Sequence, residues 1–120
     1  MTPQEIFNFS VNHMRKQGVR AYRGKIDLCS YRTPEGLSCA VGCFINDDKL
    51  AKEMDNLKGP NNIDSIINTP DLGRKLPDWM RDNVNLLQDL QHLHDLYLGT
   101  DQFEGEVRSI AVFHGLEVPK

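Results

Sequence analysis

Apolar side chains recur at helical spacing over most of the chain, and this pattern predicts mainly helices. The first helix begins at Pro3, with Thr2 as its N-cap residue and Glu5 completing a capping box, and Gly18 ends it. Later segments are bounded in the same way by Asn, Asp, Pro or Gly residues, which start or end helices. The predicted helical segments are residues 3–17, 47–57, 63–67, 78–98 and 101–114.

Residues 19–32 follow a different pattern, with apolar side chains at roughly strand-like spacing and no capping residues. The Thr-Pro-Glu-Gly tetrapeptide at 33–36 is typical of a tight turn, because proline fixes φ and glycine accepts a positive φ. The sequence therefore predicts a hairpin between residues 26–32 and residues 37–40.

The apolar run at residues 37–45 fits two structures. It is either a strand or a short helix with Ser38 as its cap, which would place Cys39 and Cys43 one turn apart. In that helix Gly42 would allow another element to approach closely. Together the elements predict one α+β domain spanning all 120 residues, mainly helical, with four or five helices around a small antiparallel β-hairpin.

Charge is distributed unevenly along the chain. Residues 1–32 carry six basic and two acidic side chains, whereas residues 33–120 carry eight basic and fifteen acidic ones. This balance is too acidic for general duplex DNA binding, but it allows a local anion site near residues 20–32. No apolar run approaches the roughly 18 residues of a membrane span, and there is no secretory signal pattern. With an odd number of cysteines, the chain is expected in the cytoplasm.

The four histidines lie on different helix faces. His94 projects into the middle of the apolar stripe of the helix predicted at 78–98, whereas His92 projects away from it. His13 lies within the predicted apolar face of the first helix, and His114 within that of the last helix. The first face consists of Ile6, Phe9, Met14 and Gln17, and the second of Phe103, Val107, Ile110 and Phe113. A buried imidazole needs partners for its ring nitrogens. We therefore expect His94 to pack against the cysteine-bearing stretch, residues 29–43, and to border a pocket.

Arginine and tyrosine residues alternate in the basic segment, a combination that suits a phosphate-bearing ligand. Arginine binds phosphate oxygens in a bidentate way, and tyrosine rings stack on nucleotide bases. On adjacent strands these side chains would line a small anion-binding surface, with a histidine deeper in the pocket. The candidate ligand-binding residues are Arg20, Arg23, Tyr31, Arg32 and His94.

The three cysteines allow two other kinds of chemistry. A Cys39 thiolate at a helix N-terminus, with His94 as its base, would give a small thiol-dependent hydrolase. A Cys₃His set would bind zinc, although the spacing lacks the paired Cys-x-x-Cys knuckles of zinc sites. Buried core thiols are the plainer interpretation, and no cofactor is expected. The candidate zinc ligands are Cys29, Cys39, Cys43 and His13, with His94 as the alternative histidine.

Several motifs resemble those of a group of small proteins from tailed bacteriophages and some bacteria. The most specific is the Cys-Ala-x-Gly core at 39–42, and a Leu-Gln-x-Leu-His-Asp motif follows at 90–95. Where those relatives often carry proline before the first aspartate of an Asp-Asp pair, this chain has Asn46. The other matching motifs are Gln17-Gly18, Cys29-x-Tyr31-Arg32, Gly36-Leu37, Cys43-Phe44-Ile45 and Asp47-Asp48.

The resemblance implies a phage accessory protein in the host bacterial cytoplasm and no particular reaction. Such a protein is expected to counter a host or defence system by binding, either by sequestering a nucleotide-like or phosphate ligand or by engaging a host protein. The thiol-dependent hydrolase is the alternative. A homo-oligomer is left open by the sequence.

Overall fold

Helices make up most of the structure. The computed structural model describes residues 1–23, 28–57 and 61–120, with Arg23, Leu28 and Cys29 described by their backbone alone. The short elements η1 and η2 are a 3₁₀-helix and a π-helix. In chain order the elements are α1 (Pro3–Gln17), β1 (Tyr22–Arg23), β2 (Leu28–Cys29), η1 (Gly42–Phe44), α2 (Asp48–Asp55), α3 (Ile63–Ile67), α4 (Pro70–Gly73), α5 (Asp78–Asp82), α6 (Val84–His92), η2 (Leu93–Tyr97) and α7 (Phe103–His114).

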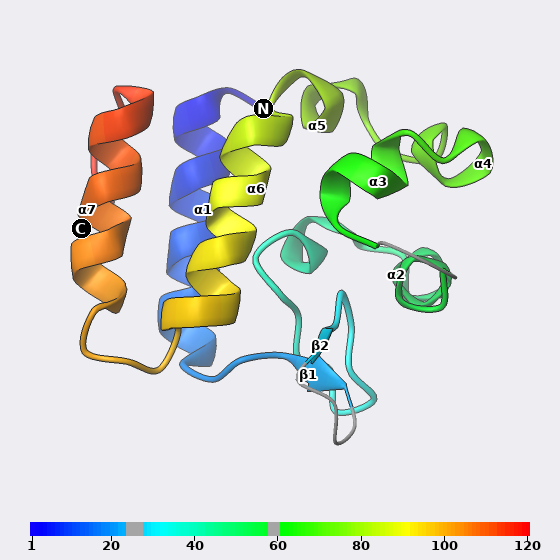
Figure 1. The fold of residues 1–120 in the computed structure, drawn as a ribbon, viewed down its shortest axis with the longest axis horizontal. Helices are drawn as coiled ribbons and strands as arrows, with labels where there is room; N and C mark the ends of the chain where they lie inside the picture. Colours follow the sequence, from blue (N-terminus) through cyan, green and yellow to red (C-terminus); the bar gives the residue numbers. More distant parts are fainter. Residues whose placement is uncertain (24–27, 58–60) are drawn as a thin grey trace.

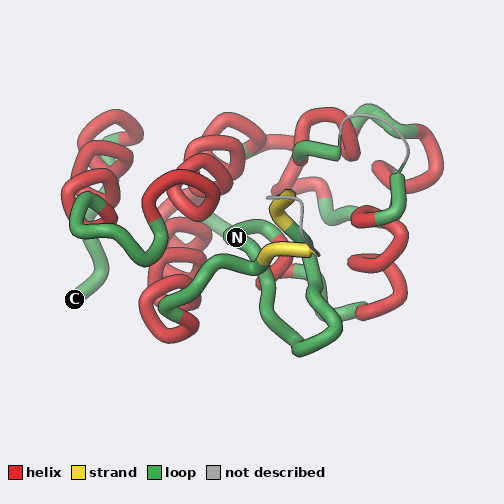
Figure 2. The backbone as a smooth tube through the Cα atoms, turned by 60° about the horizontal axis from the view of Figure 1, so that its bottom comes forward, coloured by secondary structure: helices red, strands yellow, loops and turns green. Residues whose placement is uncertain are grey.

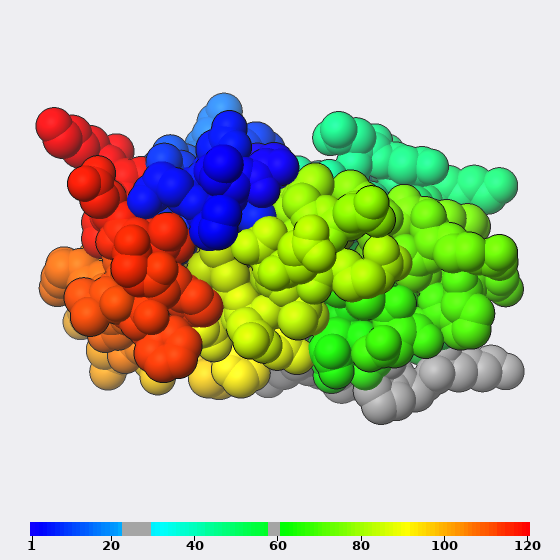
Figure 3. Space-filling view, turned by 90° about the horizontal axis from the view of Figure 1, so that it is seen from above, coloured from blue at the N-terminus to red at the C-terminus, as the bar shows by residue number. Residues whose placement is uncertain are grey.

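Three longer helices form one half of the molecule. α1, α6 continued by η2, and α7 pack side by side, and the shorter helices α2 to α5 lie beyond α6 (Figure 1). Seen from above, α7 occupies one end and the short helices occupy the other (Figure 3). α7 therefore has neighbours on one side and an open surface on the other. The core between the helices contains Phe7, Met14, Leu87, Leu90 and Val107, each fully buried.

The first helix forms where the sequence predicts it. Thr2 and Glu5 make both hydrogen bonds of the capping box, and Gly18 ends the helix in the left-handed conformation at φ 72°. The buried face is turned from the predicted one, because Phe9 remains 49% exposed. Its ring packs instead against the ring of Phe44, with centroids 5.0 Å apart.

The predicted α+β class is wrong, because the described chain is helical and contains no sheet that could carry helices. Extended pairing is confined to β1 and β2, two residues each, with Tyr22 opposite Cys29 (Figure 2). The predicted hairpin between residues 26–32 and 37–40 is wrong for the described residues, because β2 in the first segment pairs with β1. The two predicted segments are joined by a backbone hydrogen bond from the Cys39 N–H to the Ser30 carbonyl at 3.2 Å, without forming a strand pair. Residues 26 and 27 lie outside the described chain. The strand alternative for residues 37–45 is likewise wrong, since the run holds η1.

The physical reason lies in the partners of the backbone groups. The N–H groups of Tyr31 and Arg32 donate to the side chain of Asp55, and that of Ser38 donates to the side chain of Gln17. Because side chains satisfy these groups, no neighbouring strand is needed. Only the turn at 33–36 is as predicted, with Gly36 at φ 91°.

The long helix predicted at 78–98 is divided. Asn83 leaves helical geometry at φ −125° and ψ 30°, which separates α5 from α6. At the other end α6 passes into the π-helix η2, and Gly99 follows at φ 85°. Residues 58–60, predicted to end the helix after residue 47, lie outside the described chain, and that helix, α2, is capped by Asp47.

Close approach at Gly42, predicted from its place in the apolar run, is confirmed. A Cβ atom added there would lie 2.1 Å from the carbonyl oxygen of Tyr31. The absence of a side chain at Gly42 thus lets the end of the cysteine-bearing stretch pack directly on its own beginning at Tyr31.

Candidate functional site

His94 is fully buried within η2, and both of its ring nitrogens are hydrogen-bonded. Nε2 accepts from the backbone N–H of Ala21 at 3.0 Å, so Nδ1 carries the proton and donates to Asp95 at 2.9 Å. The predicted burial of His94 and exposure of His92 are confirmed. The partners differ from the expectation, since they come from the chain after α1 and from η2 rather than from the cysteine-bearing stretch. With Nε2 occupied, the ring has no free position for a substrate proton.

Arg20 lies at the end of the same π-helix. Its guanidinium donates to the carbonyl oxygens of Leu98 at 2.9 Å and Leu96 at 3.3 Å, and to the hydroxyl of Tyr22 at 2.7 Å. The Tyr22 hydroxyl in turn donates to the carbonyl of Asp95. These carbonyls would otherwise lack partners at the helix C-terminus, where a positive charge is also favourable. Arg20 thus joins the end of η2 to the chain that leads into β1.

Arg32 is engaged even more completely. It donates to the Ser38 hydroxyl, to the Asp48 carboxylate, and to the carbonyls of Gly42 and Ile45. Four of the five N–H donors of a guanidinium are therefore occupied. The single donor that remains is insufficient for a bidentate contact with phosphate.

Tyr31 and Asp55 form a buried polar centre beside Arg32. The Asp55 carboxylate accepts from the Ser30 hydroxyl and the Tyr31 N–H, both at 2.7 Å, and from the Arg32 N–H at 3.2 Å. The Tyr31 hydroxyl donates to the carbonyl of Asn61, and its ring is 3% exposed. This tyrosine therefore does not present its ring for stacking on a base.

The predicted ligand-binding residues thus divide between two places. Arg20 and His94 are at η2, whereas Arg32 is bonded to Asp48 at the start of α2 and Tyr31 to Asp55 at its end. Arg23 contributes backbone to β1, and its side chain lies outside the described part. Beside Arg32 there is a pocket of about 450 Å³ between the turn at 33–36 and α2, which we call the turn–α2 pocket. It is lined by Arg32, Thr33, Pro34, Gly36, Asp48, Lys52, Asp55 and Asn56.

The two cysteines whose side chains the structure describes are free thiols, Cys39 in the core and Cys43 partly buried. Cys39 is fully buried, and its sulfur accepts from the N–H of Gly42 at 3.3 Å. Burial raises the pKa of the Cys43 thiol far above its ordinary value, and the neighbouring Cys39 raises it further. The surroundings of Cys43 therefore disfavour a reactive thiolate. Burial of the His13 side chain lowers the pKa of its imidazole. Its Nε2 donates to the carbonyl of Ser38 at 2.9 Å.

Among the residues whose side chains the structure describes, no group of three or more His, Cys, Asp or Glu side chains is arranged to hold a metal ion. The predicted zinc site remains untested, because the Cys29 side chain lies outside the description. His13 is engaged with Ser38 as above. No described helix has the length and apolarity needed to cross a membrane.

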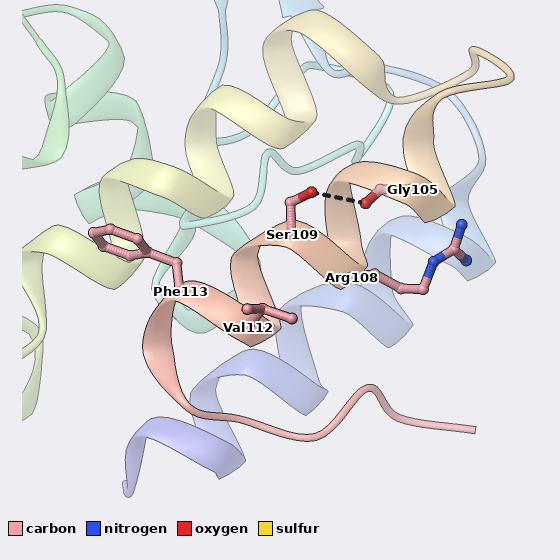
Figure 4. Close-up of a pocket in the computed structure, with 5 residues that line it drawn as sticks. All are labelled: Gly105, Arg108, Ser109, Val112 and Phe113. Atoms are coloured by element: carbon pink, nitrogen blue, oxygen red, sulfur yellow. Dashed lines mark hydrogen bonds between the residues drawn. The ribbon is translucent and has the colours of Figure 1, made fainter.

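The outer side of α7 was missed by the sequence analysis. Phe113, predicted to face the core, is 81% exposed, and its neighbour Val112 is 82% exposed. At about 100° per residue, Phe113 lies about 120° around the helix from Val107, which is fully buried, so Phe113 falls outside the buried face of α7. These side chains border a hollow of about 480 Å³, drawn in Figure 4. Its lining is Gly105, Arg108, Ser109, Val112 and Phe113.

Comparison of the chain with protein families, with curated proteins and with solved structures gave no match.

Proposed function

We propose that this protein acts by binding a partner protein through the outer side of α7, defined by Gly105, Arg108, Ser109, Val112 and Phe113. The observation that carries the proposal is the exposure of Val112 and Phe113, each above 80%, beside a hollow floored by small residues. Exposed apolar side chains gathered around a hollow are typical of interaction sites.

Small residues make the surface accessible to a partner helix or loop. Gly105 has no side chain, and a Cβ added there would meet only the end of the Arg108 side chain at 3.8 Å. The Ser109 hydroxyl donates back to the carbonyl of Gly105 at 3.2 Å, so it presents little unsatisfied polarity to an apolar partner (Figure 4). A partner chain would therefore reach the helix backbone between the two larger side chains.

The described groups to which the sequence assigned catalysis or phosphate binding are largely engaged within the protein. The His94 nitrogens, the Cys39 sulfur and four donors of Arg32 all have internal partners. This supports binding rather than thiol-dependent hydrolysis. In the setting that the resemblance to phage proteins implies, the partner is a host or defence protein, and the protein is a cytoplasmic accessory factor.

The test is affinity capture from a bacterial lysate with quantitative comparison of variants. The double variant Val112→Ser/Phe113→Ser removes the apolar surface, and Val19→Ser, at a position 54% exposed, is the matched control. We expect a protein enriched by the wild type and by the control to be lost, about tenfold or more, with the double variant. Equal enrichment with all three proteins, or none with the wild type, would contradict the proposal.

A small ligand in the turn–α2 pocket is the second candidate. Its volume of about 450 Å³ lies within the range of small-molecule sites. Lys52 supplies an exposed ammonium group there. Thermal-shift measurements with nucleotides and inorganic phosphate test this candidate. Stabilisation of the wild type that is absent in Lys52→Ala would support it, and no shift with any of these compounds would reject it.

A further inference from the structure

A second, narrower groove lies along α7, next to the outer side, where this helix meets η2. Its volume is about 230 Å³, below the usual range for a small-molecule site, so it suits one long side chain rather than a whole ligand. We call it the η2–α7 groove. Its lining consists of Asp89, His92, Leu93, Leu96, Tyr97, Glu106 and Ile110.

We propose that the η2–α7 groove receives an arginine side chain of the partner protein. The inference rests on the proposed function, because it names a residue that the partner of α7 carries. The groove lies on the same helix as Val112 and Phe113, so one partner segment can contact both surfaces.

The walls suit the aliphatic part of an arginine. Leu96 is 58% exposed at the groove, and Ile110 follows Glu106 by one helical turn on the same face of α7. Long cationic side chains lay their methylene groups along such apolar surface and keep the charged head at its polar end. The ring of Tyr97 adds a surface on which a planar guanidinium can stack.

The polar lining of the groove consists of the carboxylates of Glu106 and Asp89 and the exposed imidazole of His92. Glu106 is half-buried, and in the described part of the structure its carboxylate makes no hydrogen bond or ion pair. Asp89 is held by the Nε2 of His114 at 2.7 Å, so Glu106 is the carboxylate available to a ligand. A carboxylate in a partly apolar groove pairs most favourably with a guanidinium, which offers two parallel N–H donors.

The elements around the groove carry a net negative charge, which also favours a cationic side chain. From residue 84 to residue 114 the chain carries five carboxylates and one arginine. One of the five, Glu104, is neutralised by Arg15, whose guanidinium lies 2.7 Å away. The remaining excess favours a positively charged segment over a neutral or acidic one.

The experiment uses the whole protein and two synthetic peptides. The ¹⁵N-labelled protein is titrated with Ac-Leu-Arg-Leu-NH₂ and, separately, with the same peptide carrying citrulline, which keeps the shape of arginine without its charge. We expect the arginine peptide to shift the amide signals of Leu96, Tyr97, Glu106 and Ile110 with a Kd of about 1–10 mM, and the citrulline peptide to leave them unchanged.

Two variants complete the test. Glu106→Gln should weaken binding of the arginine peptide about fivefold or more, whereas Glu35→Gln, at an exposed position in the turn at 33–36, should not change it. Equal shifts with both peptides, unchanged affinity in Glu106→Gln, or no shift at the groove would each overturn the inference. None of these measurements depends on Val112 or Phe113, so the lysate experiment can fail or succeed separately.

Discussion

The Nε2 atom of His94 accepts a hydrogen bond from the backbone N–H of Ala21 at 3.0 Å, across 73 residues of sequence. Both groups are buried, so each satisfies the other away from water. The bond joins η2 to the segment between α1 and β1, and Arg20 reinforces the same junction from the surface. In this protein a histidine with an aspartate neighbour, a pair often found in active sites, serves as a structural connection.

Replacing His94 should therefore destabilise the fold. His94→Ala leaves the Ala21 N–H buried without a partner, and we expect the free energy of unfolding to fall by about 1–3 kcal/mol. His92→Ala, at an exposed position of α6, should lie within about 0.5 kcal/mol of the wild type. Urea denaturation followed by circular dichroism measures both. Equal and small effects would show that the bond to Ala21 contributes little.

Two glycines should respond in opposite directions to the same substitution. Gly42→Ala would place a methyl group 2.1 Å from the carbonyl oxygen of Tyr31, and the loss of stability should exceed about 3 kcal/mol. Gly105→Ala meets only a flexible side chain at 3.8 Å within a helix, so it should stabilise the protein by about 0.5–1 kcal/mol. Thermal unfolding of the two variants gives the comparison. A tolerated Gly42→Ala would contradict the close packing of the cysteine-bearing stretch.

His13 should make stability depend on pH near neutrality. Burial lowers its pKa in the folded protein, while the unfolded chain keeps a value of about 6.5. The unfolded state therefore binds the proton first, and the contribution of His13 is full above about pH 6.5 and declines as the pH falls below it. Urea denaturation at about pH 7.5, 6.5 and 5.5 should show a shallower decline for His13→Gln than for the wild type. Parallel curves would exclude this contribution.

The cysteines should be inert in the folded protein. Cys39 is fully buried, and burial holds the pKa of Cys43 far above its ordinary value, so neither should react with iodoacetamide at about pH 8. In a Cys29→Ser background, mass spectrometry should find no label on the native protein and two labels after urea denaturation. Selective labelling of native Cys39 would instead favour the thiol-dependent hydrolase.

Local signals predicted much of the helical structure. Thr2, Glu5 and Gly18 define α1 because capping depends on residues within one turn of each other. The burial of His94 followed from periodicity, and the tight packing of Gly42 followed from its place in an apolar run. These features are encoded by neighbours in sequence.

The candidate site could not be predicted in the same way. The roles of Arg20 and Arg32 depend on backbone carbonyls 78 and up to 13 residues away, and the sequence does not show which carbonyls need donors. The exposure of Phe113 depends on how α7 is rotated against its neighbours, and an aromatic residue near an apolar stripe does not reveal that rotation. The predicted ligand-binding residues are therefore separated by polar contacts between residues far apart in the sequence, which the sequence does not reveal.

The Asp55 carboxylate occupies an anion-binding arrangement formed by residues 30–32. Two successive backbone N–H groups and the Ser30 hydroxyl surround this carboxylate, so the chain already contains a receptor for an anion, occupied by one of its own side chains. Removing that side chain would leave the receptor vacant at the edge of the turn–α2 pocket. An Asp55→Gly protein should consequently be a chemically rescuable variant, regaining part of its lost stability when formate or acetate fills the vacancy.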